Sequence, residues 1–248
     1  MTFPSSTDQF RIPGTFNFRD TGGLRTVSGA RVRPGVLLRS AQLSGLDERG
    51  HAVLRELGVA HVHDLRGLEE IDNIGHDRLP EDVRLRVTPF DSRMGAAPPH
   101  DSDGTTALTH MLEVYRVFPQ LPEANAAITE IAESIAQGDG AVLVHCAAGK
   151  DRTGWAVATL LRAVGVVEDD VYADYLRSNH AVPALRAMLG ATLGQGAEPS
   201  PDLLGVREEY LNVATESVHM LHGDHAAFVA AAGIDTKLLA RLRDRLLV

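Results

Sequence analysis

The sequence predicts an α/β fold in which a small, mostly parallel sheet is flanked by helices. Three observations predict it. Short β-prone runs alternate with a helical segment in the first third of the chain. Four apolar residues, Ala141-Val-Leu-Val144, lie between Gly140 and His145, as expected for a strand buried on both faces of a sheet. Helix-prone sequence then continues to the end of the chain, and we expect a single domain over residues 1–248.

The first third of the chain contains three β-prone runs and one helix. Apolar spacing predicts the helix over residues 46–57, with Asp47 as its N-cap and Gly58 at its end. The β-prone runs are residues 35–39, 59–65 and 84–90. Strands that alternate with helices in this way are typical of an α/β sheet.

The remainder is predicted to be helical apart from the buried strand. Two loop-like stretches, residues 91–104 and 194–202, are rich in Pro, Gly, Ser and Asp, but neither resembles a domain linker. Pro119 and Pro122 separate the first two helices of this part. The helices are predicted over residues 107–118, 123–137, 153–164, 169–179, 183–193, 203–221 and 235–247.

Composition excludes several classes of function. A formal net charge of -9 provides no general attraction to nucleic acid or to an anionic membrane surface, so an anionic ligand must be held locally. The single cysteine cannot form an internal disulfide, which favours a reducing compartment. Because we find neither a secretory signal nor an apolar run of about 20 residues, we expect a cytoplasmic protein without stable membrane insertion. Export without a cleaved signal would leave no trace in this sequence, and the oligomeric state stays open.

One loop carries most of the predicted chemistry. The segment His145-Cys-Ala-Ala-Gly-Lys-Asp-Arg-Thr-Gly154 joins the buried strand to a helix, where α/β proteins place ligand sites. A phosphate-binding loop (P-loop) needs inward-pointing N–H groups, and its small residues permit that curvature. These residues are Ala147, Ala148 and Gly149. The following helix adds its positive end.

The same loop predicts a nucleophile and a phosphate clamp. Cys146 attacks only as a thiolate, which the N–H groups that bind phosphate also stabilise. Arg152 can fold over the loop and hold two phosphate oxygens with its planar fork. Attack by Cys146 would form a phosphocysteine, which water hydrolyses. We expect His145 to orient the thiolate or the loop through hydrogen bonds without having to transfer protons. Thr153 is expected either to hydrogen-bond the sulfur or to cap the helix.

At these residues the sequence resembles the cysteine-dependent protein tyrosine phosphatase superfamily, and more closely the bacterial subfamily of mycobacterial protein tyrosine phosphatase B. The resemblance extends over nearly the whole chain. It implies the phosphatase α/β fold with additional helices covering the pocket, Cys146 as nucleophile, Arg152 as phosphate ligand, and Lys150 and Asp151 as shared loop residues. The stretches that carry it besides the loop are Asn17-Phe-Arg-Asp20 with Gly22-Gly23, Leu38-Arg-Ser40, Asp64-Leu-Arg66, Tyr175-Leu-Arg-Ser-Asn179 and Gly205-Val-Arg-Glu-Glu-Tyr210.

Two aspartates compete as the general acid that protonates the leaving oxygen. Asp151 lies inside the loop beside Arg152, where a bound phosphate would favour its protonated form. Asp91 follows Pro89-Phe90 and begins a loop rich in Pro and Gly, a position typical of a mobile acid loop. Of the two, Asp151 is narrowly favoured. The polar residues Asn17, Arg19, Asp20, Arg39 and Arg66 are expected to support the site without touching substrate.

The sequence leaves the substrate class open. Lys150 would add a second cation, so phosphoinositides join phosphotyrosine and phosphoserine or phosphothreonine proteins as candidates. We expect no metal or organic cofactor, because no ligand set with familiar spacing accompanies His61 and His63 or the later histidines. The alternative functions are a phosphoester-binding module without turnover and a rhodanese-like sulfurtransferase, although the Arg152-Thr-Gly154 continuation argues against the latter.

Overall fold

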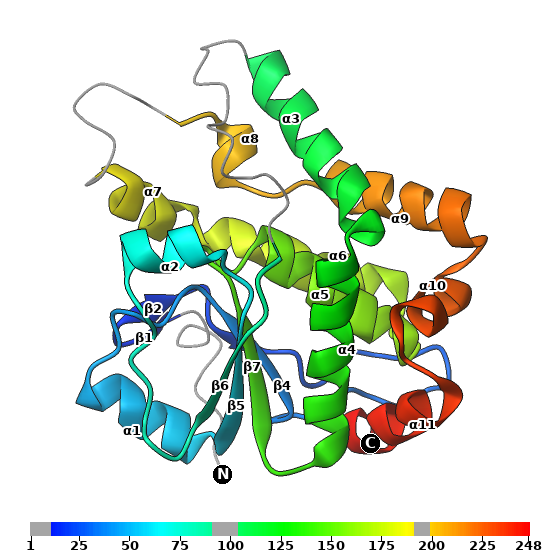
Figure 1. The fold of residues 1–248 in the computed structure, drawn as a ribbon, viewed down its shortest axis with the longest axis horizontal. Coiled ribbons are helices and arrows are strands. Elements are labelled where there is room, and N and C mark those ends of the chain that lie inside the picture. The colour runs from blue at the N-terminus through cyan, green and yellow to red at the C-terminus, as the bar shows by residue number, and fades with distance from the viewer. Residues whose placement is uncertain (1–10, 91–103, 191–198) are drawn as a thin grey trace.

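A five-stranded sheet forms the centre of the computed structural model, which describes residues 11–90, 104–190 and 199–248 (Figure 1). The strand order is β3-β4-β7-β5-β6. Strands β4, β7, β5 and β6 are mutually parallel, and β3 runs antiparallel to β4, so the predicted mostly parallel sheet is confirmed. The strands are β3 (Arg19–Asp20), β4 (Leu37–Ser40), β5 (Val59–Asp64), β6 (Arg84–Val87) and β7 (Ala141–His145), and β1 (Arg11–Ile12) and β2 (Thr15–Phe16) form a separate antiparallel pair.

The central strand β7 is buried on both faces, as its apolar run predicted. Val142 and Val144 belong to one apolar cluster, whereas Leu143 faces the other. The larger cluster includes α4 (Pro122–Gln137), α5 (Asp151–Ala163) and α11 (Thr236–Leu246), and the smaller includes α1 (Glu48–Glu56). Helices therefore cover the two faces of the sheet.

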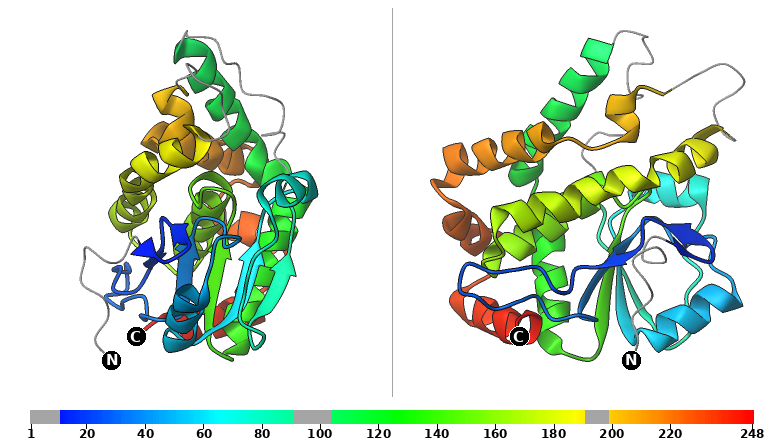
Figure 2. Two further views of the ribbon diagram at one scale, coloured as in Figure 1. Left: turned by 90° about the vertical axis from the view of Figure 1, so that its left-hand side faces the viewer. Right: turned by 180° about the vertical axis from the view of Figure 1, so that it is seen from behind.

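Further helices lie beyond the carboxyl ends of the parallel strands (Figures 1 and 2). There α3 packs against α8 and α9. The helices of this part are α3 (Gly104–Val117), α6 (Glu168–Leu176), α7 (Val182–Gly190), α8 (Pro201–Leu204) and α9 (Glu208–His222). The short turn η2 (Arg177–Ala181) joins α6 to α7, and η1 (Phe118–Gln120) leads from α3 to α4. After α9 the chain returns through α10 (His225–Ala232), which packs against α4 and α5. None of the helices in the described ranges is both long enough and apolar enough to cross a bilayer.

One predicted helix, residues 203–221, was wrong in extent. The structure divides it into α8 and α9, with Gly205 extended between them. The amide of Asn179 holds this break, because its Oδ1 accepts from Val206 N at 2.7 Å and its Nδ2 donates to Val206 O at 3.0 Å. A side chain outside the segment thus competes with the helical hydrogen bonds.

Two helices were missed by the periodicity analysis, and one predicted cap is confirmed. The missed helices are α10 and the seven-residue α2 (Leu68–Ile74). Both are short, which makes their apolar spacing a weak signal. In α1, Asp47 is the N-cap as predicted, and its carboxylate accepts from the N–H groups of Arg49 and Gly50.

Candidate active site

The segment at residues 146–152, called the cysteine loop below, runs from the end of β7 into the first two residues of α5. His145, the last residue of β7, lies opposite Ser40 of β4 and Asp64 of β5, so three parallel strands end at one level beside this loop. Cys146 is buried, with 3% of its surface exposed. Because nearly all of α5 is buried in the core, the loop is attached to a rigid element on each side.

The carbonyl groups of the cysteine loop point at the surrounding scaffold. Asn17 Nδ2 donates to the carbonyls of Ala148 and Gly149, at 3.0 Å each. The N–H of Gln42 donates to the carbonyl of Ala147 at 3.1 Å. Asn17 is buried and has a φ of 54°, a left-handed conformation that asparagine tolerates better than most residues. The loop conformation is therefore fixed from outside.

This arrangement turns a row of N–H groups away from the scaffold. In a trans peptide the carbonyl and the next N–H point in opposite directions, and the described residues contain no cis peptide. The N–H groups that follow the three anchored carbonyls are those of Ala148, Gly149 and Lys150. Among the hydrogen bonds of the described residues, these N–H groups do not act as donors. They therefore point away from the scaffold, an orientation that would suit an anion-binding loop.

Glycine is the only residue type that fits at position 149. Its φ is 67°, and a Cβ atom there would lie 2.0 Å from the carbonyl oxygen of Ser40. Its own carbonyl accepts from Arg39 Nη2 at 2.8 Å. The loop therefore lies directly on the end of β4, which only a residue without a side chain permits.

A buried ion network supports the loop from behind. Asp174 of α6 accepts from Arg19 Nε at 2.8 Å and from Arg39 Nη1 at 2.7 Å. Burial opposes the ionisation of Asp174, but the two guanidinium groups outweigh it and lower its pKa to about 2. Two arginines share one carboxylate, so a net positive charge remains under the loop. The prediction that Arg19 and Arg39 are scaffold residues agrees with these contacts.

Arg152 is held by a carboxylate that the sequence analysis missed. Its Nη1 and Nη2 pair with the two oxygens of Glu70 at 2.5 and 2.6 Å, and Nη1 also donates to the carbonyl of Leu65. The pKa of Glu70 is lowered, because the hydrogen bonds and charge of Arg152 outweigh its burial. The Nε atom of Arg152 is buried without a hydrogen-bond partner in the described part of the chain. Glu70 also accepts from Gly67 N at the start of α2, a capping pattern that could have identified it.

Asp151 lies in the same loop with both of its oxygens engaged. Tyr115 of α3 donates to Oδ1 at 2.9 Å, and Lys150 Nζ lies 2.6 Å from Oδ2. Tyr175 donates in turn to the Tyr115 hydroxyl at 2.7 Å. Burial, followed by the charge of Asp151, raises the pKa of both tyrosines. Asp91, the competing candidate, lies outside the described residues.

Two further residues of the loop were given roles from the sequence. Lys150, expected as a second cation in the pocket, is buried. Thr153 does not cap the helix, since α5 begins after Lys150 and the Thr153 hydroxyl is buried with no hydrogen-bond partner among the described residues. The structure leaves its suggested contact with sulfur as a prediction.

Asp64, Asp77 and His145 lie close enough together to share a metal ion. The guanidinium of Arg66 bonds both carboxylates, however, and its charge would repel a cation. Of the two histidines that the sequence singles out, His61 and His63, the second bonds Ser134, and burial lowers its pKa to about 3. We assign no metal to either group.

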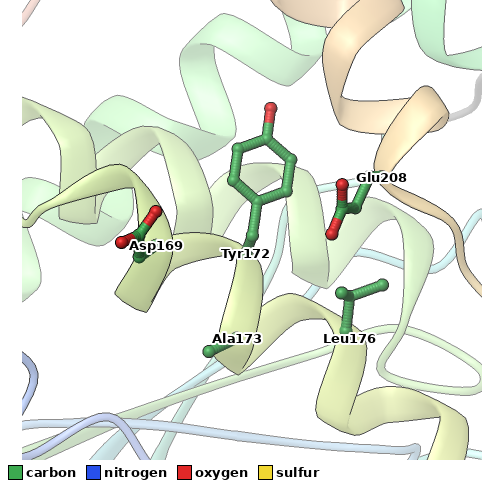
Figure 3. Close-up of a pocket in the computed structure, with 5 residues that line it drawn as sticks. All are labelled: Asp169, Tyr172, Ala173, Leu176 and Glu208. Atoms are coloured by element: carbon green, nitrogen blue, oxygen red, sulfur yellow. The ribbon is translucent and has the colours of Figure 1, made fainter.

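A hollow between α6 and α9 is separate from the cysteine loop (Figure 3). Tyr172 and Leu176 form its apolar wall, and the carboxylates of Asp169 and Glu208 lie at its margin. Two carboxylates repel a phosphate ester. We therefore do not assign the phosphate site to this hollow.

Comparisons with known proteins converge on one family. A family model described as "Tyrosine phosphatase family" matches residues 10–248. Triple specificity protein phosphatase PtpB of Mycobacterium tuberculosis is 35% identical over 275 residues, which cover 95% of this chain and 98% of PtpB. A tyrosine-protein phosphatase of Nostoc commune is 28% identical over 84% of this chain and 73% of its own length. Among solved structures, P. aeruginosa TpbA matches with a TM-score of 0.38 and 17% identity over 82% of this chain and 89% of TpbA, which is too distant to support an argument.

Proposed function

This chain belongs to the tyrosine phosphatase family, and we propose that it hydrolyses phosphate monoesters through a phosphocysteine formed on Cys146. The observation that carries the mechanism is the anchoring of the carbonyls of Ala147, Ala148 and Gly149 on the scaffold. It leaves the following N–H groups to bind an anion beside the thiol. The amino end of α5 adds a positive potential at the same place.

In the proposed binding step, the cysteine loop holds three phosphate oxygens next to the sulfur. The N–H groups of Ala148, Gly149 and Lys150 donate to two or more of them. The buried Nε of Arg152 offers a further donor, while Glu70 keeps the guanidinium plane in place through the other two nitrogens. A guanidinium fixed in this way stabilises the charge that develops on the oxygens during transfer without having to reorganise.

The proposed reaction has two steps. First, the Cys146 thiolate forms a bond to phosphorus while the bond from phosphorus to the leaving oxygen breaks, and Asp151 gives its proton to that oxygen. Second, water attacks phosphorus, Asp151 takes a proton from this water, and the sulfur leaves as a thiolate. Phosphate would attract Lys150 away from Asp151 and disfavour the ionised carboxylate, which prepares Asp151 to act as an acid.

The proposed substrates are phosphotyrosine first, and phosphoserine or phosphothreonine proteins and phosphoinositides in addition. The name of the PtpB relative assigns triple specificity to that protein. In this chain the support is the buried Lys150, a second cation in a loop that would suit a ligand with more than one phosphate. We propose that no metal or organic cofactor takes part.

Trapping the intermediate tests this function. In a chelating buffer, the protein should release p-nitrophenolate in a burst of about one equivalent per chain when hydrolysis of the intermediate is slow. Acid quenching should then leave a phosphate adduct on the peptide that contains Cys146, detected by mass spectrometry. Turnover that needs an added divalent metal and leaves no adduct would exclude the mechanism. Tight phosphate binding without release would favour the binding module, and cyanide-dependent sulfur transfer would favour the rhodanese-like alternative.

The role of Asp151 is tested by changing the leaving group. The Asp151→Asn variant should lose about 10²- to 10⁴-fold in kcat for an alkyl phosphate, whose leaving oxygen needs a proton. The loss should be much smaller for p-nitrophenyl phosphate, which leaves readily as an anion. Asp139→Asn is the matched control, because it removes the same charge on the surface before β7, where Asp139 pairs with Arg84. If Asp151→Asn hydrolysed alkyl phosphates at a normal rate, the acid would have to be Asp91 or another group.

A further inference from the structure

The imidazole of His145 lies between two hydrogen-bond acceptors. Nδ1 is 3.1 Å from the carbonyl oxygen of Cys146, and Nε2 is 2.7 Å from Oδ2 of Asp77. A carbonyl oxygen and an ionised carboxylate can only accept. Each ring nitrogen must therefore carry a hydrogen, so this geometry requires the positively charged imidazolium.

The carboxylate of Asp77 is fixed in the orientation that requires a proton on His145 Nε2. Its Oδ1 accepts from the N–H of Leu43 and from Nη2 of Arg66, both at 3.0 Å, which leaves Oδ2 for His145. Its side chain is fully buried. The pKa of Asp77 is lowered, because His145 and Arg66 outweigh its burial. A carboxylate held by three donors cannot turn to offer the ring a different partner.

The surrounding charges favour a cation at His145. From β5, Asp64 Oδ1 lies 3.7 Å from Nδ1, and His63 is neutral because burial holds its pKa at about 3. In the described part of the chain, the guanidinium of Arg66 bonds both Asp64 and Asp77. One guanidinium balances one of these two carboxylates, and the His145 imidazolium balances the other.

Arg152, the cation that α5 contributes beside the site, pairs with a different carboxylate. Arg152 pairs with Glu70, so it does not neutralise Asp64 or Asp77. Burial opposes the charged form of His145, but the hydrogen bond to Asp77 and the charges of Asp77 and Asp64 outweigh it and raise its pKa. The charge balance thus agrees with the hydrogen-bond geometry.

We propose that Asp77 is a positioning residue that keeps His145 doubly protonated and fixed to the carbonyl of Cys146, so that a permanent cation adjoins the nucleophile. The proposal rests on the proposed function only in taking Cys146 as the nucleophile. With both protons committed to acceptors, His145 does not transfer protons in the reaction. Its charge acts on the sulfur, favouring the thiolate at neutral pH and easing its departure from phosphorus.

The Asp77→Asn variant separates this role from simple charge removal. An asparagine Nδ2 can donate to His145 Nε2, so the ring can then keep a single proton and lose its charge. The midpoint pH for alkylation of Cys146 by iodoacetamide should rise by about 1 unit. If His145 stayed charged without Asp77, loss of a negative charge would move the midpoint downward. A downward shift or no shift would overturn the proposal.

Two further variants test whether the effect of Asp77→Asn acts through His145. His145→Gln keeps hydrogen-bonding groups but cannot carry the charge, so it should raise the midpoint by a similar amount. The double variant should then shift it no further than either single one, because both changes remove the same cation. Asp139→Asn should leave the midpoint unchanged. Additive shifts in the double variant would show that Asp77 acts independently of His145.

A nuclear magnetic resonance measurement on the unaltered protein avoids any effect of a substitution on folding. Its ¹⁵N-detected histidine spectrum at neutral pH should show both nitrogens of His145 protonated, whereas a ring with one bare nitrogen would overturn the proposal. Neither alkylation nor the spectrum depends on turnover. A protein that shows the charged ring but forms no phosphocysteine would therefore refute the proposed function and leave this inference intact.

Discussion

The Cys146→Ser variant is expected to lose turnover of p-nitrophenyl phosphate on the order of 10⁴-fold or more, as variants without their nucleophile do in other enzymes. A serine hydroxyl is not ionised in this pH range. The adjacent His145 cannot serve as its base, because both ring nitrogens contact acceptors. Serine is also close in size to cysteine, so the buried site should remain packed.

Binding should survive this substitution, which makes it a test of mechanism rather than of folding. The N–H groups of the cysteine loop and the guanidinium of Arg152 do not depend on the sulfur. Calorimetry should therefore still detect a phosphotyrosine peptide, and the melting temperature should stay within a few degrees of the parent. If Cys146→Ser hydrolysed the substrate at an undiminished rate, the nucleophile would have to be a different group. If it failed to bind, the loop would not be the anion site.

The Arg152→Lys variant is expected to lose about 10²- to 10³-fold in kcat/KM, the range found for loss of one transition-state donor. Three nitrogens of Arg152 have separate tasks, because two pair with Glu70 and the third is the buried Nε. Lysine has one nitrogen and cannot perform both tasks at once. Both kcat and KM should worsen, since the clamp holds the phosphate in the ground state and in the transition state.

The matched control is Arg25→Lys on the surface. Arg25 also pairs with a carboxylate through two nitrogens, in this case the carboxylate of Asp170. Its side chain is 59% exposed, and its hydrogen bonds go to Asp170 and not to the cysteine loop. The same chemical change there should leave kcat/KM within about twofold, because exposed ion pairs contribute little. Steady-state kinetics with p-nitrophenyl phosphate checks both variants. An Arg152→Lys enzyme with unchanged kcat and KM would show that the clamp lies elsewhere.

The cysteine loop could be found from the sequence because its signals are local. An apolar run followed within a few residues by Cys146, small residues and Arg152 defines a strand, a tight turn and a helix start. The N-cap Asp47 is local in the same way, since it bonds N–H groups two and three residues ahead. Hydrogen bonds over such short separations form wherever the chain is placed, so the pattern alone predicts them.

The partners that set the properties of the loop could not be found in this way. Asn17 reaches the loop across 131 positions, Glu70 reaches Arg152 across 82, and Asp77 reaches His145 across 68. These contacts exist because β4, β7 and β5 pair in parallel and end at one level. Neither the pairing order nor the alignment of strand ends is visible in any one segment.

The sequence by itself therefore determined the family, the mostly parallel α/β sheet and the residues of the cysteine loop. Only the tertiary structure decided that Glu70 orients Arg152, that Tyr115 and Lys150 engage Asp151, and that Asp77 keeps a cation at His145. The physical reason is that a motif records which groups are neighbours along the chain. The charge and orientation of a buried group depend instead on its neighbours in space, which folding brings together from distant positions.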